Sequence, residues 1–182
     1  MSSIVLNAIS ERRTIYRFKS TPIENEQLNL VLEAGRWAPS WANAQPWRFI
    51  VINGKETKEQ IGDNVPTIFS LGIKEAPICI AVCVNPKKDA FHYIEDGAAV
   101  TQNMALAAHS MGLGTMWIGI FSIRDEKKST ERKIKKILNI PDQWRIISLL
   151  PLGIPQYKET KSKSRKDLPS IVDMNSFQIR DK

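Results

Sequence analysis

The sequence predicts one domain over residues 1–182, either of the α+β class or with a mixed α/β sheet. Apolar runs typical of strands interleave with segments of helical periodicity, but at irregular spacing, so no regular repeat is indicated. The length suits one domain that buries its core without disulfides or metals. A hydrophobic share of 42% and a charged share of 25% are ordinary for globular proteins, and they exclude the disordered, collagen-like and disulfide-scaffold classes.

Helical periodicity dominates the start of the chain. Ser2 and Ser3 precede an apolar stripe, which predicts a short helix that ends near Arg12. The segment 21–24 (Thr-Pro-Ile-Glu) has the pattern of a capping box with proline in the first turn, so it predicts the start of a second helix. The apolar face of that helix is Leu28, Val31, Leu32 and Gly35. It is expected to stop in the tryptophan-rich loop 37–47.

Beyond this loop, strand patterns and helical patterns alternate. The expected elements are strands at 48–53, 78–84, 115–119 and 144–153, and helices at 55–62, 94–111 and 130–138. The pattern of residues 64–75 is ambiguous.

Residues 97–123 contain no Asp, Glu, Lys or Arg, and the stretch is long enough to cross a bilayer. Polar residues interrupt it, however, and Gly112-Leu-Gly114 breaks it. A buried helix, a glycine stop and a buried strand are therefore the better interpretation, and no membrane contact is expected. The helix from Ile94 is apolar on almost all sides, so several neighbours must cover it. In a chain this short, we expect a second subunit to supply part of that cover.

The formal net charge is +7, from 26 Lys and Arg against 19 Asp and Glu. Much of the excess lies in 124–136, which mixes both signs as a solvated helix face does, and in 158–166. No aromatic residues interleave with these lysines, so nucleic-acid binding is not favoured. Cys79 and Cys83 share one face of a predicted strand and are expected to be small core residues, with no metal site. With no secretory signal, a reduced cytoplasmic setting is expected.

The usual cofactor and hydrolase motifs find no good match. Gly112-Leu-Gly114 lacks the third glycine of a dinucleotide loop and runs from helix to strand, the reverse of that motif. The P-loop and Gly-x-Ser-x-Gly patterns do not occur. His92 and Asp96 suggest a base with a carboxylate, and His109 lies within a predicted helix, but a structural role is the favoured interpretation for both histidines.

Two groups of cationic residues suggest an anion site. Arg12, Arg13 and Thr14 stand at the expected end of the first helix and offer charge-assisted donors that suit a phosphate. Lys163 and Arg165, far along the chain, offer a second cationic pair for the same anion. Alone, either group is typical of a solvated surface.

The loop 38–47 is the strongest signal in the chain. It places Ser40, Asn43 and Gln45 between tryptophans, so hydrogen-bonding groups and flat apolar faces lie close together. That combination suits the polar edge and the face of a heteroaromatic ring. The alternative is a loop of ordinary core tryptophans and turn-forming amides.

Taken in order, these pieces make the chain resemble the nitroreductase family of FMN-dependent oxidoreductases. The resemblance covers nearly the whole chain, from Ile9 to Val172. Its pieces are Arg12-Arg13-Thr14 and Phe18; Ala38-Pro39-Ser40, Asn43 and Gln45-Pro46-Trp47; Asp96-Gly-Ala98; Gly112-Leu-Gly114 with Trp117-Ile-Gly119; Leu138 with Ile140-Pro141; Leu152-Gly153 with Pro155; and Lys163 with Arg165.

The resemblance implies a mixed, mainly antiparallel sheet flanked by helices, in an interlocked homodimer with FMN at the subunit interface. It also implies that Arg12, Arg13 and Thr14 hold the FMN phosphate and ribityl end, joined by Lys163 and Arg165. The loop of the other subunit is implied to reach the flavin with Pro39, Ser40, Trp41 and Asn43, and Gln45 is implied to line the same region. The backbone of Ile118 and Gly119 is implied to approach the isoalloxazine ring.

The implied reaction is ping-pong: NADH or NADPH gives a hydride to flavin N5, and a nitroaromatic or quinone then takes the electrons. No catalytic side chain is implied, because the flavin carries the chemistry. Two alternatives stay open. One keeps the fold with different flavin chemistry, such as dehalogenation, dehydrogenation or fragmentation of the flavin. The other is a non-enzymatic module that binds flavin or another anion.

Overall fold

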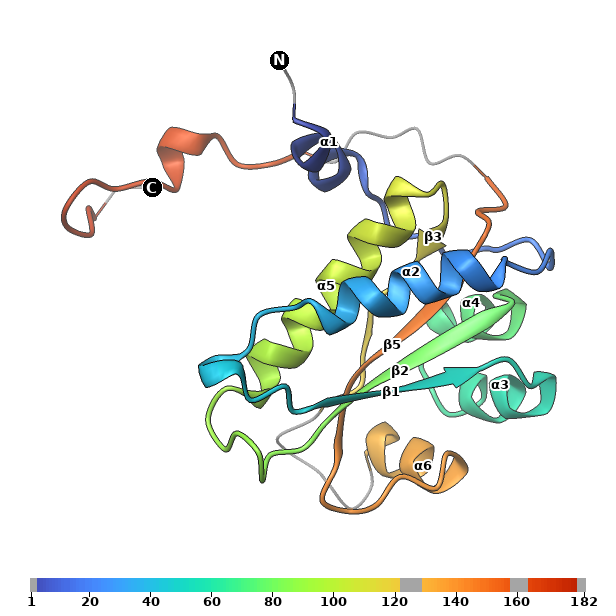
Figure 1. The fold of residues 1–182 in the computed structure, drawn as a ribbon. Helices are drawn as coiled ribbons and strands as arrows, with labels where there is room; N and C mark the ends of the chain where they lie inside the picture. Colours follow the sequence, from blue (N-terminus) through green and yellow to red (C-terminus); the bar gives the residue numbers. More distant parts are fainter. Residues whose placement is uncertain (1–2, 122–128, 158–163, 180–182) are drawn as a thin grey trace.

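The computed structural model describes residues 3–121, 129–157 and 164–179 (Figure 1). Its centre is a five-stranded sheet with the order β1-β2-β5-β3, in which β4 also pairs with β5. The strands are β1 (Trp47–Ile52), β2 (Ile78–Val84), β3 (Gly114–Thr115), β4 (Ile118–Gly119) and β5 (Arg145–Gly153). Their pairings are antiparallel, and a bridge between Thr14 and Thr115 adds a parallel contact. The expected mixed, mainly antiparallel sheet is confirmed.

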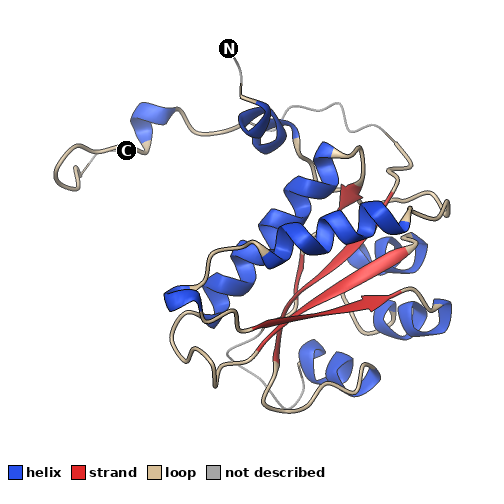
Figure 2. Ribbon diagram, in the orientation of Figure 1, coloured by secondary structure: helices blue, strands red, loops and turns tan. Residues whose placement is uncertain are grey.

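Helices cover both faces of the sheet (Figure 2). The helices are α1 (Ile4–Glu11), α2 (Asn25–Arg36), α3 (Lys55–Gly62), α4 (Thr67–Glu75), α5 (Tyr93–Ser110) and α6 (Thr130–Ile137). The alternation of side chains along β2 divides the core in two. Ile80 and Val82 pack with buried residues of α2 and α5, whereas Cys79, Ala81 and Cys83 pack with buried residues of α3, α4 and α6.

The two cysteines behave as small core residues. Cys79 and Cys83 are free and buried on the α3–α4–α6 face of the sheet. Burial raises the pKa of each thiol to about 12, so neither forms a reactive thiolate at neutral pH. The predicted structural role is confirmed.

The second helix begins later than the sequence pattern predicts. Residues 21–24 do not form the capping box; instead Glu24 is the N-cap, and the amide N–H of Glu24 donates to the side chain of Gln27 at 3.3 Å. The prediction was wrong because Glu24 and Gln27 repeat the same spacing three residues further on. The ambiguous segment 64–75 contains α4.

The strand predicted at 115–119 is divided into β3 and β4. Both pair with β5 in one continuous register, since Thr115 faces Leu152 and Ile118 faces Leu149. In that register Pro151 lies opposite Met116, where it accepts from the Met116 N–H at 3.3 Å. Proline has no N–H to return a hydrogen bond, so the ladder is interrupted there.

The long apolar helix α5 packs against α2, and both helices lie on one face of the sheet (Figure 1): α5 contacts β2, β3 and β5, and Gly35 of α2 approaches Phe49 of β1. The first turns of α5 approach β5 closely: the Thr101 hydroxyl donates to Gly97 O and lies 2.8 Å from the hydroxyl of Ser148. Other apolar residues of α5, such as Ile94, Ala98 and Leu106, stay only half-buried. The second subunit expected to cover the helix therefore remains a prediction. In the described part of the chain, no helix has the length and apolar content of a membrane span.

Candidate cofactor site

The arginine stretch is anchored at the edge of the sheet. After α1 ends, Thr14 bridges to Thr115 of β3, and the Ile15 N–H donates to Thr115 O at 2.9 Å. These backbone contacts fix Arg12 and Arg13 beside the C-terminal end of α5, where α1 also packs. The short helix followed by a β-bridge therefore carries the cationic residues to the edge strand β3.

Arg12 lies in a cationic cluster with Arg13 and Arg165. Burial lowers the pKa of Arg12, and the positive charges of Arg13 and Arg165 lower it further. The Arg12 Nε atom is buried and has no hydrogen-bond partner among the described residues. Arg13 is oriented by its Nη1 atom, which donates to Ser10 O at 2.6 Å and to Arg12 O at 2.9 Å. An orphaned donor among like charges fits an anion such as a phosphate.

A cavity of about 480 Å³ opens beside this cluster. Arg13 and Ile15 line one side, and His109 and Leu113, from the C-terminal end of α5 and the turn after it, line the other. The volume lies within the range of small-molecule sites. Arg165 lies close enough to Arg12 to lower its pKa, and Lys163 lies outside the described residues, so their joint binding of one anion stays a prediction.

Ile118 and Gly119 form an accessible strip of backbone three residues beyond Thr115. Ile118 is buried, but Gly119 is exposed, and a Cβ placed on it would meet no described atom within 4 Å. On that side of Gly119, no described residue blocks the approach of a flat ring to the backbone.

The tryptophan-rich loop adopts a conformation unusual for its residues. Ala42, Asn43 and Gln45 have φ values of 47°, 56° and 46°, in the left-handed region that favours glycine. The hydroxyl of Ser40 accepts from the Gln45 N–H at 3.0 Å and so closes the loop. The Trp41 ring is 57% exposed and stacks on the His92 ring with centroids 5.2 Å apart. Strained backbone of this kind concentrates at functional sites.

The loop and the arginine cluster lie at opposite ends of α5 (Figure 1). The Trp41 N–H donates to Asp96 in the first turn of α5, whereas the cavity beside Arg13 includes His109 in the last turn. At 1.5 Å per residue, the axial separation of these two helix positions is about 20 Å. Gly119 of β4 pairs with Ser148, whose hydroxyl contacts Thr101 in the middle of α5, so the β4 backbone lies along the helix between these two ends. The structure does not bring loop 39–45 to the cationic cluster within one chain.

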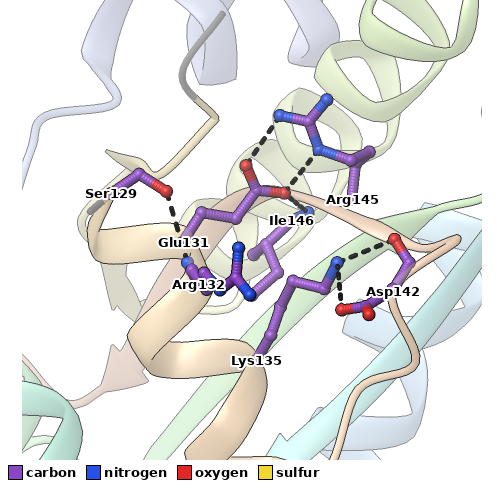
Figure 3. Close-up of polar contacts among 7 residues, drawn as sticks. All are labelled: Ser129, Glu131, Arg132, Lys135, Asp142, Arg145 and Ile146. Carbon is purple, nitrogen blue, oxygen red and sulfur yellow. Dashed lines mark hydrogen bonds and ion pairs between the residues drawn. The ribbon is translucent and has the colours of Figure 1, made fainter. Parts of the chain in front are cut away.

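A second pocket, of about 280 Å³, lies between α6 and β5 and is an ion-pair cluster (Figure 3). Glu131 is only 3% exposed, and it accepts from Arg145 Nε and Nη2 at 2.8 Å each and from the Ile146 N–H at 2.9 Å. Lys135 Nζ donates to Asp142 O at 2.9 Å. The prediction of a solvated face was therefore wrong for Glu131, which ties α6 to the sheet.

The sequence indicated His92 and Asp96 as a possible pair, but it did not predict that Asp89 joins them in a buried polar cluster under the tryptophan-rich loop. Asp89 and Asp96 are 4% and 5% exposed, and both lie close to His92. The signal was an acidic residue in the first turn of an otherwise apolar helix, where a helix dipole favours negative charge. No group of three or more His, Cys, Asp or Glu in the described ranges is arranged to hold a metal ion.

Comparisons with known proteins point to one family. The model of the Nitroreductase family matches residues 9–69 and 66–154. A Methanothermobacter thermautotrophicus protein named NADH dehydrogenase/NAD(P)H nitroreductase is 32% identical over 153 residues, which are 83% of this chain and 77% of that protein. A crystal structure of a Parabacteroides distasonis protein of the same name has a TM-score of 0.87 at 27% identity, covering 97% of this chain and 100% of that one. An FMN-dependent nitroreductase from Clostridium difficile has a TM-score of 0.85 at 27% identity, covering 94% and 99%.

Proposed function

The chain belongs to the nitroreductase family, and we propose that it is an FMN-dependent oxidoreductase that uses NADH or NADPH to reduce nitroaromatic or quinone-type acceptors. The observation that carries the proposal is the arginine cluster. The buried Nε atom of Arg12 has no partner in the described part of the chain, and Arg13 and Arg165 repel it. A phosphate would satisfy the donor and balance the charge at once.

At this end of the site, Arg12, Arg13 and Thr14 would hold the FMN phosphate and ribityl chain, with Lys163 and Arg165 as further cationic partners. Arg12 would contribute most to phosphate binding, because its Nε–H group is already buried and loses little further hydration when a phosphate binds. The Thr14 backbone forms the bridge with Thr115, which keeps Thr14 at the edge of the sheet directly after the arginines.

The backbone of Ile118 and Gly119 would lie against the isoalloxazine ring, since exposed Gly119 leaves that strip open. The chemistry that FMN supplies when bound is acceptance of a hydride from NADH or NADPH and delivery of electrons to the acceptor. The chain then needs to bind, orient and shield the ring rather than to supply an acid or base.

We further propose a homodimer in which the partner's copy of loop 39–45 completes the site with Pro39, Ser40, Trp41, Asn43 and Gln45. The separation of about 20 Å along α5 keeps this loop away from the arginine cluster of its own chain. Residues 164–179 run away from the body (Figure 1) and expose large apolar side chains. These are Leu168, Ile171, Met174, Phe177 and Ile179, with exposed fractions from 58% to 90%. Such surface is typical of subunit contacts, and a second copy both covers it and completes the site.

The decisive experiment is the visible absorption spectrum of the purified protein before and after anaerobic addition of NADH or NADPH. Flavin bands that bleach on addition would support the proposal and identify the better donor. Bands that persist would retain the FMN site but favour different flavin chemistry or a binding module. A colourless protein that also fails to bind added FMN would overturn the proposal.

A further inference from the structure

Two buried carboxyl groups lie together under loop 39–45. One oxygen of each is used: Asp89 Oδ1 accepts from the N–H groups of Phe91 and His92 at 3.1 Å, and Asp96 Oδ1 accepts from the Trp41 N–H at 3.2 Å. The Oδ2 atoms of both residues are buried, and neither has a conventional donor among the described residues. The position is therefore costly for two negative charges.

Both residues are linked to His92, since Asp89 Oδ1 accepts from the His92 N–H and the Asp96 N–H donates to His92 O at 2.9 Å. A single proton between the two unpartnered oxygens would supply the donor that both lack. Burial raises the pKa of Asp96, and the neighbouring negative charge of Asp89 raises it further. Burial acts in the same direction on Asp89, but the N–H groups of His92 and Phe91 outweigh it and lower the pKa of Asp89 overall. Of the two residues, Asp96 is therefore the one that would hold a shared proton and donate it to the Asp89 carboxylate.

Few other groups face this pair. His92 Nδ1 lies 3.4 Å from Asp89 Oδ1, and a protonated His92 would pair with that carboxylate. Loop 39–45 contributes the Trp41 N–H and ring but contains no titratable side chain. The sheet contributes only apolar side chains near this point: Val84 and Ile147 approach Gly97, the residue that follows Asp96 in α5. Glu95, on the same turn of α5, is exposed.

We propose that Asp96 and Asp89 share a single proton and that Asp96, through its hydrogen bond to Trp41, is a positioning residue for the flavin-contacting loop 39–45. The loop needs such support, because its left-handed residues Ala42, Asn43 and Gln45 cost free energy. Loss of the shared proton places two buried negative charges side by side, and displacement of the loop relieves their repulsion. FMN affinity therefore falls as the pH rises through the ionisation of Asp96. This inference rests on the proposed function, since loop 39–45 is assigned there to the partner's FMN.

The test compares three variants of the holoprotein, with free FMN measured in ultrafiltrates after dilution over a range of pH. In Asp96→Asn the amide oxygen still accepts from Trp41 and the amide N–H donates permanently to Asp89. Its FMN affinity is expected to match wild type at low pH and to exceed it at high pH, by up to about tenfold per pH unit, the limit for one proton. Taking the ratio to wild type at each pH cancels the titration of the FMN phosphate itself. Asp96→Ala loses both hydrogen bonds and is expected to bind FMN more weakly at every pH, while Glu95→Gln, a control on the same turn, should titrate as wild type does.

An infrared spectrum provides a second readout that does not depend on FMN affinity. Protein labelled with 13C-aspartate is expected to show the shifted carbonyl band of a protonated carboxyl group, absent from Asp96→Asn and lost from wild type at high pH. A missing band, or an Asp96→Asn variant whose FMN affinity follows the wild-type pH profile, overturns the inference. A wild-type protein that binds no FMN at any pH contradicts the proposed function and the loop assignment with it, and the infrared band alone then decides whether the proton is shared.

Discussion

The two ends of α5 carry the two parts of the proposed site, and they are stabilised in opposite ways. At the C-terminal end, Arg12, Arg13 and Arg165 repel one another, and the buried Nε atom of Arg12 lacks a partner in the described ranges. At the N-terminal end, the strained loop is held by hydrogen bonds to Ser40 and Asp96. The arginine end is thus preorganised for a ligand at some cost to stability, whereas the loop end is supported by the protein itself. Mutations in the arginine cluster should therefore change FMN binding, whereas mutations under the tryptophan-rich loop should change the conformation of that loop.

The largest effect on stability is expected at the buried ion pair between Glu131 and Arg145, which lies outside the proposed site and serves as a reference for the mutations at both ends of α5. Glu131→Gln removes the carboxylate that accepts from Arg145 and from the Ile146 N–H in a position only 3% exposed. Breaking such a buried pair is expected to lower the free energy of unfolding by about 3–5 kcal/mol. Chemical denaturation measures this loss, and Glu56→Gln on the exposed side of α3 is the control. A loss below about 1 kcal/mol would show that the pair behaves as a surface contact.

At the arginine end, Arg12→Ala is expected to weaken FMN binding by about 10- to 100-fold, the worth of a charge-assisted hydrogen bond. Its thermal stability should remain at the wild-type level or rise, because one member of a like-charged cluster is removed. Titration with FMN and a melting curve measure the two effects. Arg36→Ala, which removes an exposed ion pair with Glu33 on α2, should leave FMN affinity unchanged. If Arg12→Ala lost stability but kept its FMN affinity, Arg12 would have a structural role and not a binding role.

At the loop end, the stability of the carboxyl pair should depend on pH in two directions. The raised pKa of Asp96 gives a contribution that is present at low pH and lost as the pH rises through its folded-state value. The lowered pKa of Asp89 gives a contribution that is present above its unfolded-state value and lost as the pH falls. The melting temperature of wild type relative to Asp96→Asn should therefore decrease on the alkaline side of the Asp96 transition. A pH-independent difference would argue against the shared proton.

The smallest effect is expected at Ala42, whose φ of 47° suits glycine better than alanine. Ala42→Gly is expected to raise the free energy of unfolding by about 0.5 kcal/mol, the balance of relieved strain and greater chain entropy. Ala42→Val is expected to lower it, since a β-branched residue tolerates this conformation poorly. The two melting curves should fall on opposite sides of wild type. If both variants were equally destabilised, the loop would not store strain at this position.

Local sequence patterns predicted the elements well where the signal is contained in a few neighbouring residues. The helices at 55–62 and 94–111 and the strand at 78–84 follow from apolar periodicity, and the structure confirms them within a residue. The start of α2 was misplaced because two capping patterns overlap around Glu24. The break at Met116 was missed because it depends on Pro151, a residue that only strand pairing brings opposite.

The candidate site was predicted unevenly for the same reason. The adjacent residues Arg12, Arg13 and Thr14, and the loop around Ser40, Asn43 and Gln45, were recognisable because each is continuous in the sequence. The Asp89–Asp96 pair and buried Glu131 were not, because the burial that gives them their properties comes from segments elsewhere in the chain. A carboxylate in a sequence does not reveal whether water or another carboxylate will face it.

The sequence by itself determined the α+β class, the order of the elements and the adjacency of two arginines and a hydroxyl at Arg12, Arg13 and Thr14, because periodicity and adjacent donors are local properties of the chain. The tertiary structure decided that the arginines meet Arg165 at one end of α5, that the tryptophan loop lies at the other end, and that Asp96 lies beside Asp89. These juxtapositions arise from packing between distant segments, and packing determines which charges are shielded from water and which remain without a partner.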